Sequence, residues 1–80
     1  MTRIFTVRSL EQVGVGQTAA VADVPGADPI SLRLLEMGLT PGIEVAVVGA
    51  APLGDPVELE VRGYRLSIRR REAALVTVAS

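Results

Sequence analysis

Two Pro-Gly pairs, at residues 25–26 and 41–42, limit where regular structure can form in this chain. Proline interrupts a helix and glycine adopts conformations that other residues avoid, so each pair predicts a turn. The segment between the pairs begins with Asp28 followed by a proline, which favours a helix start, and Gly38 is the residue type that ends a helix. We therefore predict one main helix over about residues 29–37.

Strand patterns occupy most of the remaining chain. Apolar and polar residues alternate after the second Pro-Gly pair, which is typical of half-buried strands. The candidate strands are residues 18–24, 43–47, 57–61, 64–69 and 74–79, the last of them preceded by a polar break, "RRRE". Several short strands with one helix predict a mainly β fold, a small closed or half-closed barrel, in which curling the sheet hides exposed edges.

The Arg62-Gly63 pair predicts a two-residue hairpin turn. With that loop, Glu60 faces Arg65 and Leu59 faces Leu66 across the two strands. Glycines at the predicted turns are expected to be structural, because they adopt backbone conformations that other residues resist. These glycines are Gly38, Gly42, Gly54 and Gly63.

The N-terminal end carries weaker signals. Residues 1–8 have no clear period, and they form either a leader or an added edge strand. Ser9 can cap a short N-terminal helical turn at residues 10–13. We therefore divide the chain into a leader, 1–8, and one domain, 9–80.

The chain contains no His, Cys or Lys. The usual zinc, haem and iron–sulfur ligand sets and nucleophile–His pairs therefore cannot be assembled. The "GVG" at residues 14–16 is followed by neither a Walker lysine nor the third glycine of a dinucleotide-binding loop. We predict no cofactor, no metal ligand set and no enzymatic activity.

Charge and hydropathy restrict the partners. The net charge is −1, whereas a domain that binds nucleic acid is usually basic. No run reaches the roughly 18 apolar residues of a membrane-spanning helix, and the N-terminus lacks the apolar run of a signal peptide. We expect a cytoplasmic protein with no nucleic-acid partner and no direct membrane insertion.

The predicted helix is apolar on two sides. At about 100° per residue, one stripe closes the barrel and Leu32 lies on the far side, flanked by Arg33 and Glu36. The closing stripe consists of Ile30, Leu34 and Met37, with Leu35 at the boundary. The Leu32 side is a candidate partner surface, and the alternative is that a loop or the leader covers it.

Two further places are candidate partner surfaces. Leu53 lies in the loop "APLGDP", residues 51–56, and three consecutive arginines, Arg69, Arg70 and Arg71, follow the second strand of the hairpin. The arginines either contact an acidic partner or have a structural or solubility role.

The segments "ISLRLLEMGLTPGIEVAVV" and "APLGDPVELEVRGYRLSIRRREAALVTV" occur in this order and together resemble a FeoA-family domain over about Leu10 to Val78. The resemblance implies an SH3-like β-barrel with the helix inserted after the first strand. It also implies a cytoplasmic, non-catalytic protein-binding module of bacterial ferrous iron uptake. The implied partner is FeoB, a membrane protein with a GTP-binding domain that moves Fe²⁺ inward. Leu32 departs from the family, whose members more often carry a basic or polar residue there.

A similar barrel forms the C-terminal domain of DtxR-type iron-dependent regulators. A free-standing SH3-like adaptor with a different protein partner therefore stays open as the alternative, and so does self-association. An RNA-binding barrel is disfavoured by the acidic composition and the single Tyr.

The lack of His and Cys generates a prediction about iron. We expect the isolated protein to bind Fe²⁺ or Mn²⁺ more weakly than micromolar, because soft and imidazole ligands are missing. Anaerobic titration calorimetry measures this affinity. A micromolar or tighter site would contradict the prediction.

Overall fold

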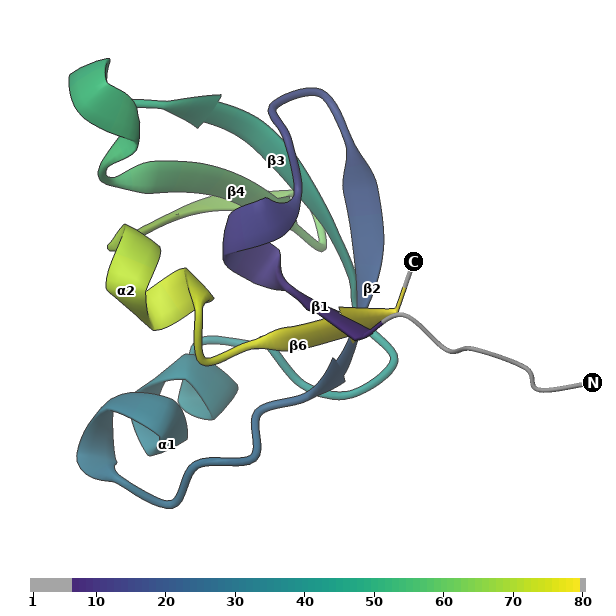
Figure 1. Ribbon diagram of the computed structural model, residues 1–80. Coiled ribbons are helices and arrows are strands. Elements are labelled where there is room, and N and C mark those ends of the chain that lie inside the picture. Colours follow the sequence, from purple (N-terminus) through teal and green to yellow (C-terminus); the bar gives the residue numbers. More distant parts are fainter. Residues whose placement is uncertain (1–6, 80) are drawn as a thin grey trace, which may run out of the picture.

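The computed structural model describes residues 7–79, which form one curved antiparallel sheet with short helices beside it (Figure 1). The elements in chain order are β1 (Val7–Ser9), η1 (Leu10–Gln12), β2 (Thr18–Asp23), α1 (Pro29–Glu36), β3 (Glu44–Ala50), η2 (Pro52–Gly54), β4 (Val57–Val61), β5 (Tyr64–Ile68), α2 (Arg70–Ala73) and β6 (Thr77–Ala79). Among these residues no helix has the length and apolar character needed to cross a membrane.

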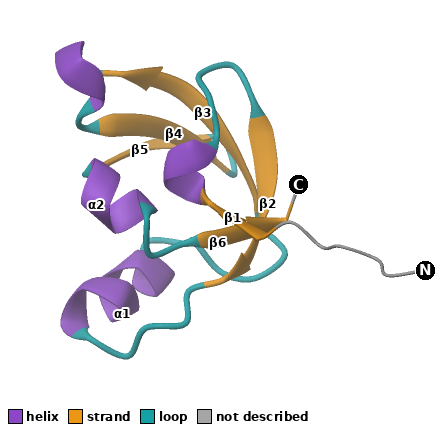
Figure 2. Cartoon of the chain, viewed as in Figure 1, coloured by secondary structure: helices purple, strands orange, loops and turns teal. Residues whose placement is uncertain are grey.

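The six strands follow the order β1-β6-β2-β3-β4-β5. No strand pairing within residues 7–79 joins β1 to β5, so the barrel is half-open, one of the two forms expected. Figure 2 shows the strands bending around one side of the molecule and the helices lying along the other. Residues 1–6 of the expected leader lie outside the described residues, whereas Val7 and Arg8 belong to edge strand β1 and pair with β6.

Alternating side chains of the strands build the core. Strand β4 buries every second residue from Val57 to Val61, and β3 does so at Val45 and Val47, because successive side chains point to opposite faces of a sheet. The largest fully buried side chains are Leu10, Leu34, Leu39, Leu59, Val21, Val45, Val47, Val61, Val76 and Val78. The predicted period is thus confirmed, and the core is built from side chains without aromatic rings.

Helix α1 begins and ends as predicted. The Asp28 carboxylate accepts hydrogen bonds from the Ser31 backbone N–H at 3.3 Å and the Ser31 hydroxyl at 2.8 Å. The Ser31 hydroxyl and N–H lower the pKa of the Asp28 carboxyl, because they stabilise its charged form. At the other end Gly38 has φ of 106°, and the N–H groups of Gly38 and Leu39 donate to the carbonyls of Leu35 and Leu34. This is the Schellman arrangement that stops a helix.

The face of α1 that packs on the barrel differs from the predicted stripe. Ser31 and Leu34 are buried and Met37 is half-buried, but Ile30 is 40% exposed. Ser31 can occupy the buried position because Asp28 satisfies its hydroxyl, and this rotates Ile30 outward. The stripe is therefore wrong at Ile30, while Leu32 is half-exposed as expected.

The hairpin between β4 and β5 has the predicted register, with Glu60 opposite Arg65 and Leu59 opposite Leu66. Arg62 and Gly63 have φ of 50° and 84°, the conformation of a type I′ turn. Ahead of β2, the short turn η1 also forms after Ser9, but its cap differs: Gln12 Oε1 accepts the Ser9 backbone N–H at 2.9 Å.

The polar break predicted at "RRRE" is wrong, because Arg70–Ala73 forms the helical turn α2 and the last strand shortens to β6. Glu72 accounts for the turn. Its Oε1 accepts the Arg69 backbone N–H at 2.8 Å, and its Oε2 forms an ion pair with Arg33 of α1. The Glu72 side chain is therefore buried with both oxygens paired, and it joins α2 to α1.

We expect Gly38→Val to lower the free energy of unfolding by more than about 1 kcal/mol, because a β-branched residue resists positive φ. A side chain there would also meet the Tyr64 hydroxyl, which lies 2.5 Å from an ideal Cβ and donates to the Met37 carbonyl. Urea titration measures the loss. Gly14→Val is the matched control, because Gly14 lacks positive φ and a Cβ there faces only the flexible Gln17 side chain. Equal stability of wild type and Gly38→Val would contradict the assignment.

Glu72→Ala should destabilise the protein by about 1–3 kcal/mol, because the Arg69 N–H and Arg33 both lose their acceptor. Glu72→Gln should lose less, since its amide oxygen can still accept the Arg69 N–H. Thermal and urea unfolding of the two variants separate the cap from the ion pair. If alanine at this position unfolds at the wild-type urea concentration, Glu72 does not hold α2.

Candidate interaction surface

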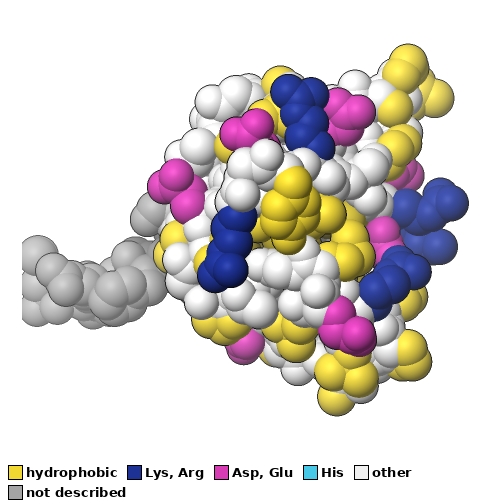
Figure 3. Space-filling view, turned by 180° about the vertical axis from the view of Figure 1, so that it is seen from behind, with side chains coloured by type: hydrophobic (Ala, Val, Ile, Leu, Met, Phe, Trp, Pro, Cys, Tyr) yellow, Lys and Arg dark blue, Asp and Glu magenta, His cyan; other side chains and the backbone are white. Residues whose placement is uncertain are grey.

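The candidate partner residues come from three elements that lie along the same side of the molecule: α1, α2 and η2 (Figure 1). Seen from behind, arginine side chains gather along this edge, with apolar side chains above and below them (Figure 3). We call this region the α1–α2–η2 surface. It consists of Ile30, Leu32, Arg33, Glu36, Leu53, Arg69, Arg70 and Arg71, all of them exposed.

Helix α1 presents an apolar patch at its solvent side. Leu32 is 50% exposed and Ile30 is 40% exposed, and Glu36 is also on the surface. Within residues 7–79 neither a loop nor another element buries the Leu32 side chain, so the interpretation that a described loop covers it is wrong. The helical wheel predicts Ile30 on the buried side of α1. The structure places Ile30 at the surface, because Ser31 occupies the buried position.

Arg33 flanks Leu32 in the sequence but is held by α2. Its guanidinium pairs with the Glu72 carboxylate, while its side chain remains 60% exposed. The pair fixes the direction of Arg33 and leaves further N–H donors on the guanidinium facing outward. No local pattern predicts this pair, since its members lie 39 residues apart.

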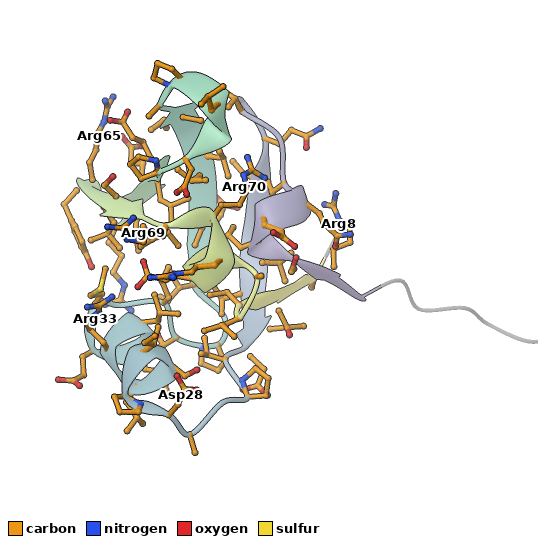
Figure 4. All side chains as sticks on the ribbon, turned by 60° about the vertical axis from the view of Figure 1, so that its left-hand side comes forward. Arg8, Asp28, Arg33, Arg65, Arg69 and Arg70 are labelled. Carbon is orange, nitrogen blue, oxygen red and sulfur yellow. The ribbon has the colours of Figure 1, made fainter. Side chains whose placement is uncertain are left out.

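The three arginines do not form one patch. Arg70 donates from its backbone N–H to Asp55 Oδ1 at 3.0 Å, from Nε to the Gly54 carbonyl at 2.9 Å and from a terminal nitrogen to the Glu11 carbonyl at 3.1 Å. Arg70 therefore ties α2 to η2 and η1. Figure 4 shows Arg69 and Arg33 on one side and Arg70 lying apart, toward η1.

Leu53 is the most exposed apolar residue described. Its side chain is fully exposed, and its backbone has φ of 72° and ψ of 8°, a left-handed conformation that is rare for leucine. Arg70 holds the neighbouring Gly54, and the Gly54 N–H donates to the Ala51 carbonyl. The loop therefore presents Leu53 outward from a fixed backbone. Strain of this kind is concentrated at functional sites.

A cleft of about 530 Å³ lies between α1, α2 and strand β5. Its lining residues are Arg33, Met37, Pro56, Ser67, Ile68, Arg69 and Glu72. Apolar atoms of Met37 and Ile68 lie beside the charged groups, so the cleft can hold both an apolar and a polar side chain. The sequence pointed to Arg33 and Arg69 but not to Met37, Ser67 or Glu72, which only the fold brings to them.

A metal ion is usually held by several ligating side chains that lie close together. Within residues 7–79 no three His, Cys, Asp or Glu side chains form a cluster. The buried Glu72 carboxylate is engaged by Arg33 and by the Arg69 N–H. The surface therefore offers shape, apolar area and arginines, the features of a protein-contact site.

A fusion of Fe(2+) transport protein A with the Fe(2+) transporter FeoB, from Porphyromonas gingivalis, is 38% identical over 69 residues, which are 86% of this chain and 8% of the fusion. This chain thus matches only a small part of that relative.

Solved structures show the same fold. A FeoA-like protein from Clostridium acetobutylicum superposes with a TM-score of 0.85 at 31% identity, covering 94% of this chain and 87% of that one. Stenotrophomonas maltophilia FeoA, described as a prokaryotic SH3 domain protein and complexed with zinc, gives 0.75 at 32% identity, covering 88% and 87%. The fold is therefore SH3-like, as the resemblance implied. A family model described as the FeoA domain matches residues 8–80, and the chain belongs to the FeoA family of ferrous iron transport.

Proposed function

We propose that this chain is a cytoplasmic, non-catalytic accessory protein of ferrous iron uptake, which binds a FeoB-type GTPase-permease through the α1–α2–η2 surface. The observation that carries the proposal is the relative in which Fe(2+) transport protein A and FeoB form one polypeptide. Fusion keeps the two parts at a high effective concentration, which benefits parts that act in contact. Separate chains need a binding surface to achieve the same contact.

The described structure supports a binding role. Ile30 and Leu32 expose apolar side chains on α1, which also carries Arg33, and Leu53 is exposed in η2, where Arg70 binds the Gly54 carbonyl. Exposed apolar residues beside a polar rim are typical of protein contacts, and arginine is enriched there. The chain lacks histidine, cysteine and lysine, so it cannot assemble a nucleophile–His pair or a Walker phosphate loop.

We expect Leu32→Glu to weaken binding to the GTP-binding domain of a FeoB-type partner, or ferrous iron uptake, at least about tenfold, because it places a carboxylate in an apolar contact. The variant should melt within a few degrees of wild type, since surface changes usually stay within about ±0.5 kcal/mol. Calorimetry measures the binding to the partner domain, and an uptake assay measures ferrous iron transport.

Two variants serve as controls. Leu34→Glu should unfold the domain, because Leu34 is fully buried and its replacement would bury an unpaired charge. Val15→Glu should leave both folding and binding unchanged, because Val15 is 63% exposed and lies in the loop before β2, outside the proposed surface. If Leu32→Glu folds and binds normally, the contact lies elsewhere, with Leu53 and Arg69–Arg71 as the next positions to change.

The same assay addresses the alternative of an adaptor with another protein partner. Wild-type protein that does not bind the FeoB-type domain would contradict the proposed partner. Sedimentation of the free protein tests self-association at the same time, since an apolar surface used between copies would give concentration-dependent dimers.

A further inference from the structure

Strand β5 forms one edge of the sheet and has a free side. It pairs with β4 alone, through the register from Val61–Tyr64 to Val57–Ile68. In a two-residue hairpin the residues flanking the turn exchange hydrogen bonds, and bonded pairs then alternate along the ladder. Tyr64, Leu66 and Ile68 therefore bond to β4, whereas the backbone groups of Arg65 and Ser67 point away from it.

These outward backbone groups have no partner in the described part of the chain. Neither the N–H nor the C=O of Arg65 or Ser67 bonds to another described residue. Both residues are exposed. An exposed edge of this kind is a template for an incoming strand.

The space next to this edge is the cleft described above. Ser67, Ile68 and Arg69 form its β5 side, and Arg33 and Met37 of the α1 region form the opposite side. The Tyr64 hydroxyl bonds to the Met37 carbonyl at 2.6 Å and bridges the two sides at one end. The cleft is thus a short channel beside the strand edge, and α1 does not fill it.

The side chains around the edge indicate what an added strand would carry. The ionisable groups in the cleft lining are Arg33, Arg69 and Glu72, and the single carboxylate is paired with Arg33. Arg69 makes no side-chain hydrogen bond within residues 7–79, and it lies on the same side as Arg65 and Arg33 in Figure 4. Met37 supplies apolar atoms on the inner side, where Ile68 is already buried in the core.

We propose that an extended segment of the partner protein, with alternating apolar and acidic residues, adds to β5 as a further strand. Its backbone would bond to the free groups of Arg65 and Ser67. Its apolar side chains would face the half-buried Met37, and its carboxylates would face Arg69 and Arg65. Peptides bind in this way to other sheet edges, where backbone hydrogen bonds give affinity and alternate side chains give specificity. The inference rests on the proposed function, since it locates part of the same contact.

The test removes one backbone donor from the edge. Ser67→Pro deletes the outward N–H and blocks strand addition, while proline is tolerated at an edge position whose N–H faces solvent. Ser67→Ala is the matched control, because it removes the hydroxyl and keeps the N–H. Calorimetry with the FeoB-type GTP-binding domain should show binding by wild type and Ser67→Ala, and a loss of at least about tenfold with Ser67→Pro. A folded Ser67→Pro protein that binds like wild type would overturn the inference and leave the proposed function intact.

A capped pentapeptide of alternating valine and aspartate separates the two proposals. Added to the labelled wild-type protein, it should shift the amide resonances of Arg65 and Ser67, and a valine–lysine version should bind at least about tenfold more weakly. The peptide titration also tests the strand-addition inference if Ser67→Pro fails to fold. No shift at Arg65 and Ser67 would overturn the strand-addition inference. Shifts at both residues without binding of the FeoB-type domain would support the edge and contradict the proposed partner.

Discussion

The arrangement of the candidate surface depends on one helical turn, α2, whose side chains bind in opposite directions. Glu72 closes the turn on the Arg69 N–H and holds Arg33 of α1. Arg70, two residues earlier, holds Gly54 and Asp55 at η2. A charge-assisted hydrogen bond is stronger than a neutral one, and here charged groups join α2 to both α1 and η2. Helix α2 thus adds a polar link between the two elements that carry the exposed leucines.

Such polar links matter more in a small domain than in a large one. An 80-residue chain has a thin core, and this one has no disulfide to support it. Its core comes mainly from valine and leucine side chains of the strands, with Leu10, Leu34 and Leu39 added from the helical segments and turns. The sheet is half-open. Strand β5 is an edge strand beside a cleft, and the chain continues from it into the helical turn α2 instead of a further strand. The same opening leaves backbone groups and apolar side chains accessible to a partner.

Local signals explain what could be predicted from the sequence. Asp28 and Gly38 set the ends of α1 through their own conformations and hydrogen bonds, and the Arg62-Gly63 turn determined the register of β4 and β5. Contacts between distant residues explain what could not. Arg33 and Glu72 meet only after the fold forms, so the sequence showed a polar break where α2 lies. Ile30 was placed in the core because a buried serine, satisfied by Asp28, does not appear in a count of apolar positions. At the candidate surface, the exposure of Leu32 and Leu53 could be predicted from the sequence, whereas the cleft between α1, α2 and β5 could not.

We infer that α2 holds α1, η2 and β5 together on one side of the molecule and that the partner binds this side. Amide chemical-shift mapping of the labelled protein, titrated with the GTP-binding domain of a FeoB-type protein, tests this directly. We expect shifts concentrated in residues 30–37, 52–55 and 65–72, with little change in β2, in β3 and at residues 14–17. Shifts confined to β2, β3 and the loop at 14–17 would contradict it, because the partner would then bind the side of the sheet away from α2.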